Sequence, residues 1–242
     1  MTVTLDQVLR FLNTTNGREK TYRGVQYFAR FYAWHLFRQG ATKDQIARWT
    51  NLKNTLAVAR KLYRLGKPLE AGQSAYAAVS HKDEFIRFTQ LGRQIGYFGY
   101  YVCEMIGWLH SIGFYKNSNN ARVLQTGFKL WLAALLCSIA SGLYKLREIN
   151  LRASVLERSK RAIAQGTEKE AAKGADVKVE SKLLEKERYA VNYQMTQDVL
   201  DALIPAATLD YIGLDDGIVG LAGLTTSIMG GMTQWKKVNG DH

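Results

Sequence analysis

The stretch that decides the fold is Lys43–Lys67, KDQIARWTNLKNTLAVARKLYRLGK. Its apolar residues recur at spacings of three and four, which on an α-helix places them in one stripe: Trp49, Leu52, Leu56, Ala59 and Tyr63. The same stretch holds seven Lys or Arg residues and one acid, Asp44. This composition is typical of a helix that lies in the surface of an anionic membrane. A bundle helix with a solvated basic face gives the same pattern, so both alternatives stay open.

The membrane alternative assigns a role to each side of this helix. The apolar stripe would insert about 5–10 Å into one leaflet as a wedge. The basic residues beside it would bind lipid phosphates: Arg48, Lys53, Arg60, Lys61, Arg64 and Lys67. One wedge bends a membrane little, so this hypothesis also requires self-association that aligns many copies.

The composition predicts an all-α protein with a basic first part. Only two of the 242 residues are proline, and helix-forming residues occur throughout. Cys103 and Cys137 both have apolar surroundings in the sequence, so we expect reduced cysteines that pack in the interior. The net charge of +12 divides into +13 over residues 1–149 and −1 over residues 150–242. The first part therefore suits an anionic partner, either lipid or nucleic acid.

Three segments are apolar enough for deep burial in a membrane: residues 94–115, 130–144 and 217–235. The first contains Glu104, and a charge at bilayer depth costs about 2.5–3.5 kcal/mol. If this segment inserts, Glu104 must therefore face protein or water. The second is uncharged but, at roughly 22 Å as a helix, is shorter than the hydrocarbon core. We expect a membrane-associated helical protein with amphipathic helices and one or more hydrophobic hairpin or transmembrane segments.

The third segment is rich in glycine, which allows helices to approach each other closely. We expect its glycines and the one just before it to form a helix-packing face, and this segment is our candidate for the contact between copies: Gly213, Gly217, Gly220, Gly223, Gly230 and Gly231. Further upstream, Gly92-x-x-x-Gly96-x-x-Gly99 lacks the spacing of a dinucleotide site and follows no predicted strand.

Charge divides the chain into three regions. We predict a basic amphipathic and hydrophobic helical region over 1–149, a mixed-charge connector over 150–190, and a C-terminal helix with the Gly-rich membrane segment over 191–242. The connector is either a long solvated helical hairpin or a flexible linker.

The sequence contains no recognisable catalytic constellation. The four histidines are isolated from one another and from the cysteines, so we expect no metal site, no cofactor and no enzymatic activity. Two alternatives to membrane bending remain. One is an oligomeric pore for metabolites, built from the 94–144 hairpin and residues 217–235. The other is a soluble nucleic-acid binder, which has no use for the uncharged segment 217–235.

Four stretches together resemble the peroxin-11 family of peroxisome-proliferation proteins, and its fungal members most. They are QYFARFYAW (26–34), RKLYRLGKPLE (60–70), WLHSIGF (108–114) and the final LDDGIVGLAGLTTSIMGGMTQW (214–235). The resemblance implies a protein of the peroxisomal membrane that elongates the membrane before fission. It also implies that an amphipathic helix near residues 60–67 bends the membrane, and that the chain associates with itself. Further implied partners are a dynamin-related fission GTPase and its adaptors, with no nucleic acid.

Overall fold

A computed structural model describes residues 3–164 and 171–240, without the side chains of residues 162–176. Eight α-helices occupy these described residues. They are α1 Leu5–Leu12, α2 Thr15–Arg38, α3 Lys43–Tyr63, α4 Lys67–Val79, α5 Glu84–Ser111, α6 Asn120–Ala164, α7 Ala171–Thr208 and α8 Asp216–Asn239. The expected all-α fold class is confirmed.

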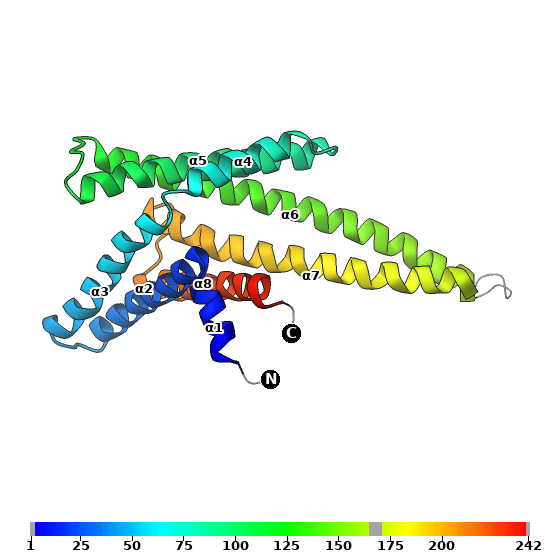
Figure 1. Ribbon diagram of the computed structural model, residues 1–242, viewed down its shortest axis with the longest axis horizontal. Coiled ribbons are helices and arrows are strands. Elements are labelled where there is room, and N and C mark those ends of the chain that lie inside the picture. The colour runs from blue at the N-terminus through cyan, green and yellow to red at the C-terminus, as the bar shows by residue number, and fades with distance from the viewer. Residues whose placement is uncertain (1–2, 165–170, 241–242) are drawn as a thin grey trace.

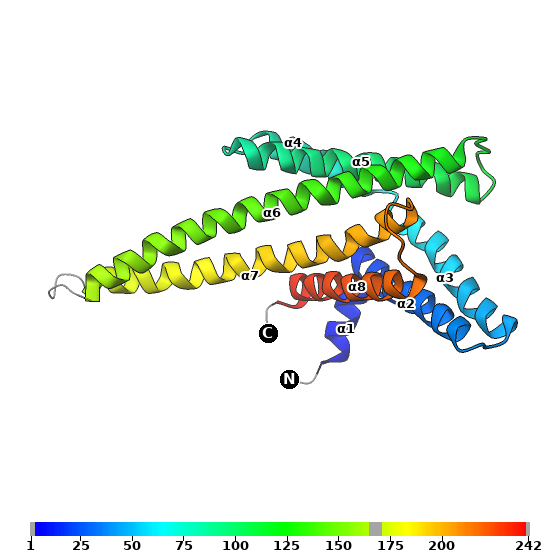
Figure 2. The same cartoon turned by 180° about the vertical axis from the view of Figure 1, so that it is seen from behind.

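Six of the helices are arranged as a ring (Figures 1 and 2). Following the neighbours in space, α5 packs on α6, α6 on α7, α7 on α8, α8 on α2 and α2 on α3. The ring closes where α3 meets α5. Outside it, α4 lies along α5, and α1 contacts α2 and α8. Helices that are distant in sequence, such as α2 and α8, therefore lie side by side.

Local sequence signals set most of the helix ends. The side chain of Thr42 accepts a hydrogen bond from the backbone of Gln45, and the Gln45 side chain accepts one from Thr42, which forms a capping box at the start of α3. Pro68 lies in the first turn of α4, where its missing N–H costs nothing. Residues 68–89 divide between α4 and α5, because the Asp83 side chain accepts a hydrogen bond from the backbone of Ile86 and so caps a new helix.

The core inside the ring is made by residues from five helices. Tyr27 of α2, Tyr100 of α5, Trp131 and Leu135 of α6, Ile204 of α7 and Val219 of α8 form one buried cluster. A second cluster, Ile149, Leu156 and Leu184, joins α6 to α7 farther along. The ring therefore has its own core, and the α6–α7 hairpin beyond it has another.

Glycines bring α8 onto α2. A Cβ on Gly217 would lie 2.6 Å from the ring of Trp34, and one on Gly220 would lie 2.8 Å from the backbone of Phe31. Gly223 meets the ring of Tyr27, and Gly230 meets the Lys20 side chain. The predicted packing face is thus used within one chain, except that Gly213 and Gly231 make no such close approach.

A similar glycine contact, which the sequence analysis did not identify as packing, joins α5 to α6. A Cβ on Gly96 would lie 2.8 Å from both the Cβ of Ala134 and the backbone oxygen of Leu130. A Cβ on Gly92 would lie 2.8 Å from the Sγ of Cys137. Both cysteines are free, as expected, and Cys103 packs in the same way against Gly127.

The mixed-charge region 150–190 belongs to the long α6–α7 hairpin that extends away from the ring (Figure 1). Of the two alternatives for this region, its described residues form the hairpin, whereas residues 165–170 lie outside the described part. The boundaries predicted at 149/150 and 190/191 fall within α6 and α7. They mark changes of charge along continuous helices.

Among the described helices, α6 is the one long and apolar enough to cross a membrane. It contains the segment 130–144, which alone is too short, within a helix of 45 residues. Residues 94–111 and 217–235 lie in α5 and α8, which do not pass the same test of length and composition.

Candidate membrane surface and charged cavity

The predicted apolar stripe of α3 divides over two sides of the helix. Trp49, Leu56 and Tyr63 follow one another at spacings of seven and are half-buried. Leu52 and Ala59, about 60° farther round the helix, are exposed. Part of the stripe therefore packs within the protein, and part of it faces outward.

Aromatic contacts hold the inner part of the stripe against α2. The ring of Trp49 lies 4.6 Å from that of Tyr32 and 5.8 Å from that of Phe28, measured between centroids. The ring of Tyr63 lies 5.6 Å from that of Tyr22. Such pairs stabilise packing by roughly 0.5–1.5 kcal/mol beyond the area that they bury. The α2–α3 pair is thus an aromatic hairpin.

The outward side of α3 exposes an apolar set that differs from the predicted stripe. Leu62 is 52% exposed, and Val58 and Leu52 are 39% and 38% exposed. Arg48 is exposed and Lys53 is half-buried on the same helix. Spacing alone does not single out Leu62, because the stripe through Trp49 and Tyr63 is equally regular.

Arg60 does not lie on this outward surface. It is 5% exposed, and its Nε and Nη2 donate to the Glu19 carboxylate at 3.0 and 2.6 Å. Its Nη1 donates to the side-chain oxygen of Gln26 at 2.6 Å. The structure thus gives Arg60 an internal carboxylate partner, in place of the lipid phosphate expected from the sequence.

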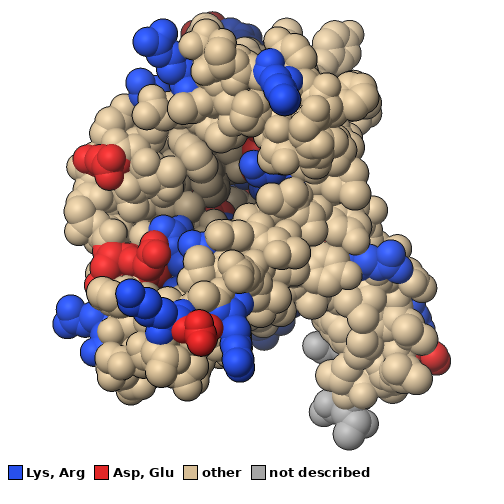
Figure 3. Space-filling model, turned by 90° about the vertical axis from the view of Figure 1, so that its left-hand side faces the viewer, with Lys and Arg blue, Asp and Glu red and all other residues tan. Residues whose placement is uncertain are grey.

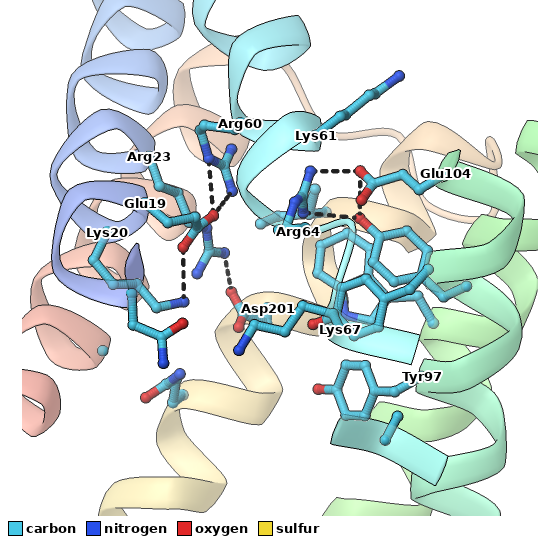
Figure 4. Close-up of a pocket in the computed structure, with 18 of the residues that line it drawn as sticks. Glu19, Lys20, Arg23, Arg60, Lys61, Arg64, Lys67, Tyr97, Glu104 and Asp201 are labelled. Atoms are coloured by element: carbon cyan, nitrogen blue, oxygen red, sulfur yellow. Dashed lines mark hydrogen bonds and ion pairs between the residues drawn. The ribbon is translucent and has the colours of Figure 1, made fainter. Parts of the chain in front are cut away.

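The other predicted phosphate-binding residues of this stretch differ in their surroundings. Arg64 Nη2 donates to the Glu104 carboxylate at 2.5 Å, and the Tyr100 hydroxyl donates to the same oxygen. Lys67 pairs with Glu70 at 2.7 Å. Figure 4 shows Lys61 extending away from this network. Arg64 therefore joins α3 to α5 and closes the ring.

Glu19 stays ionised at the centre of these contacts. Burial by itself raises the pKa of Glu19, but attraction from Lys20, Arg60 and Arg64 more than offsets it and holds the pKa well below its usual range. Lys20 lies 3.4 Å from the same carboxylate. Burial lowers the pKa of Lys20, and Glu19 opposes that shift.

These side chains line a cavity of about 640 Å³ inside the ring. Residues of α2, α3, α4, α5, α6, α7 and α8 contribute to its wall. Arg23 reaches across it from α2 to Asp201 on α7, with 2.6 Å between Nη2 and Oδ1 (Figure 4). Figure 3 shows the hollow from outside, with basic and acidic side chains within it. The arginine partners of Glu19, Glu104 and Asp201 lie 40 or more residues away along the chain, so the sequence does not assign these carboxylates to a cavity.

The outer face of the α5–α6 hairpin is apolar. Between residues 85 and 110, the exposed residues are Phe85, Phe88, Ile95 and Phe98. Between residues 130 and 144, they are Ala133, Leu136 and Leu143. Glu104 faces the protein through its ion pair with Arg64, which is the arrangement required for an inserted segment.

Comparison with known proteins gives matches along nearly the whole chain. A model of the family described as peroxisomal biogenesis factor 11 (PEX11) matches residues 5–235. Peroxisomal biogenesis factor 11 of Schizosaccharomyces pombe is 29% identical, over 94% of this chain and 93% of its own length. Peroxisomal membrane protein PMP30A of Candida boidinii is 27% identical, over 93% and 91%. Human peroxisomal membrane protein 11A is 23% identical, over 95% and 96%.

No solved structure matches the chain. In the described part of the structure, no group of three or more His, Cys, Asp or Glu residues could hold a metal ion. The extent of the family match decides the assignment, and it confirms the resemblance carried by the four sequence stretches. The chain belongs to the peroxisomal biogenesis factor 11 family.

Proposed function

We propose that this protein binds, bends and elongates the peroxisomal membrane, and so promotes fission and proliferation of the organelle. In this proposal, the α5–α6 hairpin anchors the chain in the bilayer. The outward face of α3 then lies in the surface of one leaflet as a wedge, with anionic lipids as its partners.

The family and the names of its members indicate the location. Relatives from a yeast and from human are named peroxisomal membrane proteins, and each is similar to nearly the whole of this chain. The chain is a peroxisomal membrane protein.

This mechanism is supported by two exposed apolar surfaces, one on the α5–α6 hairpin and one on α3. The outer face of α5 and α6 exposes aromatic and aliphatic side chains over two long stretches, and the charges of α5 at Arg93 and Glu104 line the cavity instead. Leu52, Val58 and Leu62 are exposed on α3, with Arg48 beside them. Contiguous exposed apolar surface of this kind marks contact with a membrane or a partner.

The test is tubulation of vesicles by the full chain reconstituted with anionic lipid. We expect Leu52→Glu combined with Leu62→Glu to reduce tubulation at least tenfold, since burying each leucine stabilises insertion by about 1.5–3 kcal/mol. Electron microscopy of the vesicles measures the effect.

Asn192→Glu combined with Thr196→Glu is the matched control. Both residues are exposed on α7, so this variant adds the same two charges without touching α3. It should tubulate like the unmodified chain. Undiminished tubulation by the double variant of Leu52 and Leu62, with its helix content intact, would rule out the wedge. Leu56→Glu is a poorer probe, because Leu56 is half-buried.

The proposal retains self-association and recruitment of a dynamin-related GTPase with its adaptors, as implied by the family. The glycine face of α8 is covered by α2 of the same chain, so copies would have to meet through another surface.

The charged cavity favours a second candidate, an oligomeric pore for metabolites. Ionisable residues enclosed by helices of a membrane protein often mark a path for solutes. Solute flux at protein densities too low for tubulation would support the pore. Its absence in oriented, reconstituted protein would remove it.

A further inference from the structure

The cavity inside the helix ring carries an excess of positive charge. Eight Lys or Arg residues line it, against four Asp or Glu residues. Two more carboxylates lie close behind the lining: Asp216 pairs with Arg30, and Asp198 interacts electrostatically with Arg93. With these included, the cations still outnumber the acids by eight to six. Enclosed charge without compensation is costly, so the cavity favours an anion.

Hydrogen-bond donors in the cavity are also left over. The Nε atoms of Arg64 and Arg93 are buried and have no hydrogen-bond partner among the described residues. The guanidinium of Arg93 lies over the ring of Tyr97, 5.8 Å from its centroid. A buried donor with no acceptor costs about 1–3 kcal/mol, and more when it is charged. Both arginines line the cavity, and each keeps a donor that no acceptor among the described residues satisfies.

Other lining residues suit an anion that carries several oxygens. Figure 4 shows Tyr97 extending from α5 toward the centre of the cavity. Gln194 and Gln197 of α7 add amide groups, and Phe128, Trp131 and Ile204 provide apolar surface. The volume of about 640 Å³ lies within the usual range for small-molecule sites. Arginine forks match the oxygen geometry of phosphate and carboxylate groups, and phosphate offers more oxygens to this many donors.

We propose that the cavity binds a phosphate group carried by a small organic molecule or by a lipid headgroup, with Arg93, Arg64 and the Tyr97 hydroxyl as its principal contacts. This site is separate from the outward face of α3. It neither requires nor excludes membrane bending.

The test is the thermal melting midpoint of the full chain in detergent. Chloride is compared at equal ionic strength with inorganic phosphate, glycerol 3-phosphate and dihexanoyl phosphatidic acid. We expect a saturable rise of roughly 5–10 °C at a hundred times the dissociation constant. A rise with the soluble phosphates identifies a soluble ligand, and a rise with phosphatidic acid alone identifies a headgroup. No rise with any of them overturns the proposal.

Variants locate the site. Arg93→Met should fold, because it removes a buried donor that has no acceptor, and it should weaken the apparent affinity at least tenfold. Arg122→Met removes an exposed arginine of α6 and should keep the full rise. An equal rise in Arg93→Met and the unmodified chain would refute the assignment. If Arg93→Met does not fold, Tyr97→Phe, which removes one hydroxyl, decides in the same way.

The double variant of Leu52 and Leu62 separates this proposal from membrane bending. Because it leaves the cavity untouched, it should retain the phosphate-dependent rise even where tubulation is lost. Failure of the wedge and failure of the phosphate site would therefore be seen in different measurements.

Discussion

Glu19 is the residue on which the inner face of α3 depends. Its carboxylate accepts two hydrogen bonds from Arg60 and lies beside Lys20, and both Glu19 and Arg60 are 5% exposed. Removing one member of a buried pair leaves the other as an uncompensated charge. The carboxylate of Glu19 therefore adds a buried ion pair to the aromatic contacts that hold α3 on α2.

We predict that Glu19→Gln lowers the free energy of unfolding by about 3–5 kcal/mol. Glu70→Gln is the control, because the Glu70 side chain is 64% exposed and its pair with Lys67 should contribute less than about 1 kcal/mol. Denaturant melts in detergent measure both. Equal small losses would show that the buried pair does not stabilise α3.

The lowered pKa of Glu19 also predicts a dependence on pH. A carboxylate whose pKa is lower in the folded state contributes stability above its unfolded pKa of 4.5, and this stability is lost as the pH falls below that value. Melting midpoints between pH 6 and pH 3 should therefore fall more steeply for the unmodified chain than for Glu19→Gln. Parallel curves would contradict the assignment.

At the scale of helices, α8 can lie close to α2 because its contact residues are glycines. Gly220→Ala would place a Cβ 2.8 Å from the backbone of Phe31, which cannot move aside as the end of a side chain can. We expect a loss of about 1–3 kcal/mol from this overpacking.

Gly231→Ala lies on the same helix, 4.0 Å from the nearest side-chain atom of Lys20. It should be neutral or stabilise by up to about 1 kcal/mol, because alanine is the better helix former. Gly220→Ala should lower the thermal melting midpoint, and Gly231→Ala should leave it unchanged or raise it. If both move alike, the close approach of α8 to α2 is not what sets the stability.

How far the sequence predicts this structure is clearest on α3. The spacing of its apolar residues predicts the helix, and the capping residues predict its start. Spacing does not show which side another helix covers, because residues 60° apart fit one stripe equally well. α2 covers Trp49 and Tyr63, whereas Leu52 stays exposed.

The charges show the same limit of prediction. Arg60 and Arg64 look available for lipid in the sequence, because their carboxylate partners lie 41 and 40 residues away. Glu104 was the one useful signal, since an acid within an apolar helix requires a partner. The cavity is formed by residues from seven helices, and no local pattern brings those together.

At the scale of the whole molecule, polar and apolar surfaces are separated. Arg93 and Glu104 of α5 line the interior cavity, while the exposed residues of α5 and α6 between residues 85 and 110 and between 130 and 144 are aromatic and aliphatic or alanine. A soluble helical protein usually has the reverse arrangement. This reversed distribution of polar and apolar surface supports the proposal that the α5–α6 hairpin holds the protein in the membrane.

We predict that Leu136→Asp combined with Leu143→Asp weakens membrane retention. Both leucines are more than half exposed, and an Asp at the centre of an inserted helix costs about 2.5–3.5 kcal/mol. Extraction at alkaline pH, followed by sedimentation, should move a larger share of this variant into the supernatant. The matched change to alanine should stay with the membrane pellet, and equal extraction of the two would exclude this face as the anchor.

The pairing of α2 with α8 has a consequence for synthesis on the ribosome. Tyr27, Phe31 and Trp34 pack against glycines that begin at Gly217, so these rings leave the ribosome long before their partner helix does. At about 5–20 residues per second, the wait lasts on the order of tens of seconds. During that time an aromatic surface is exposed to other nascent chains and to chaperones. A ribosome that stops before α8 would release a chain that cannot cover it.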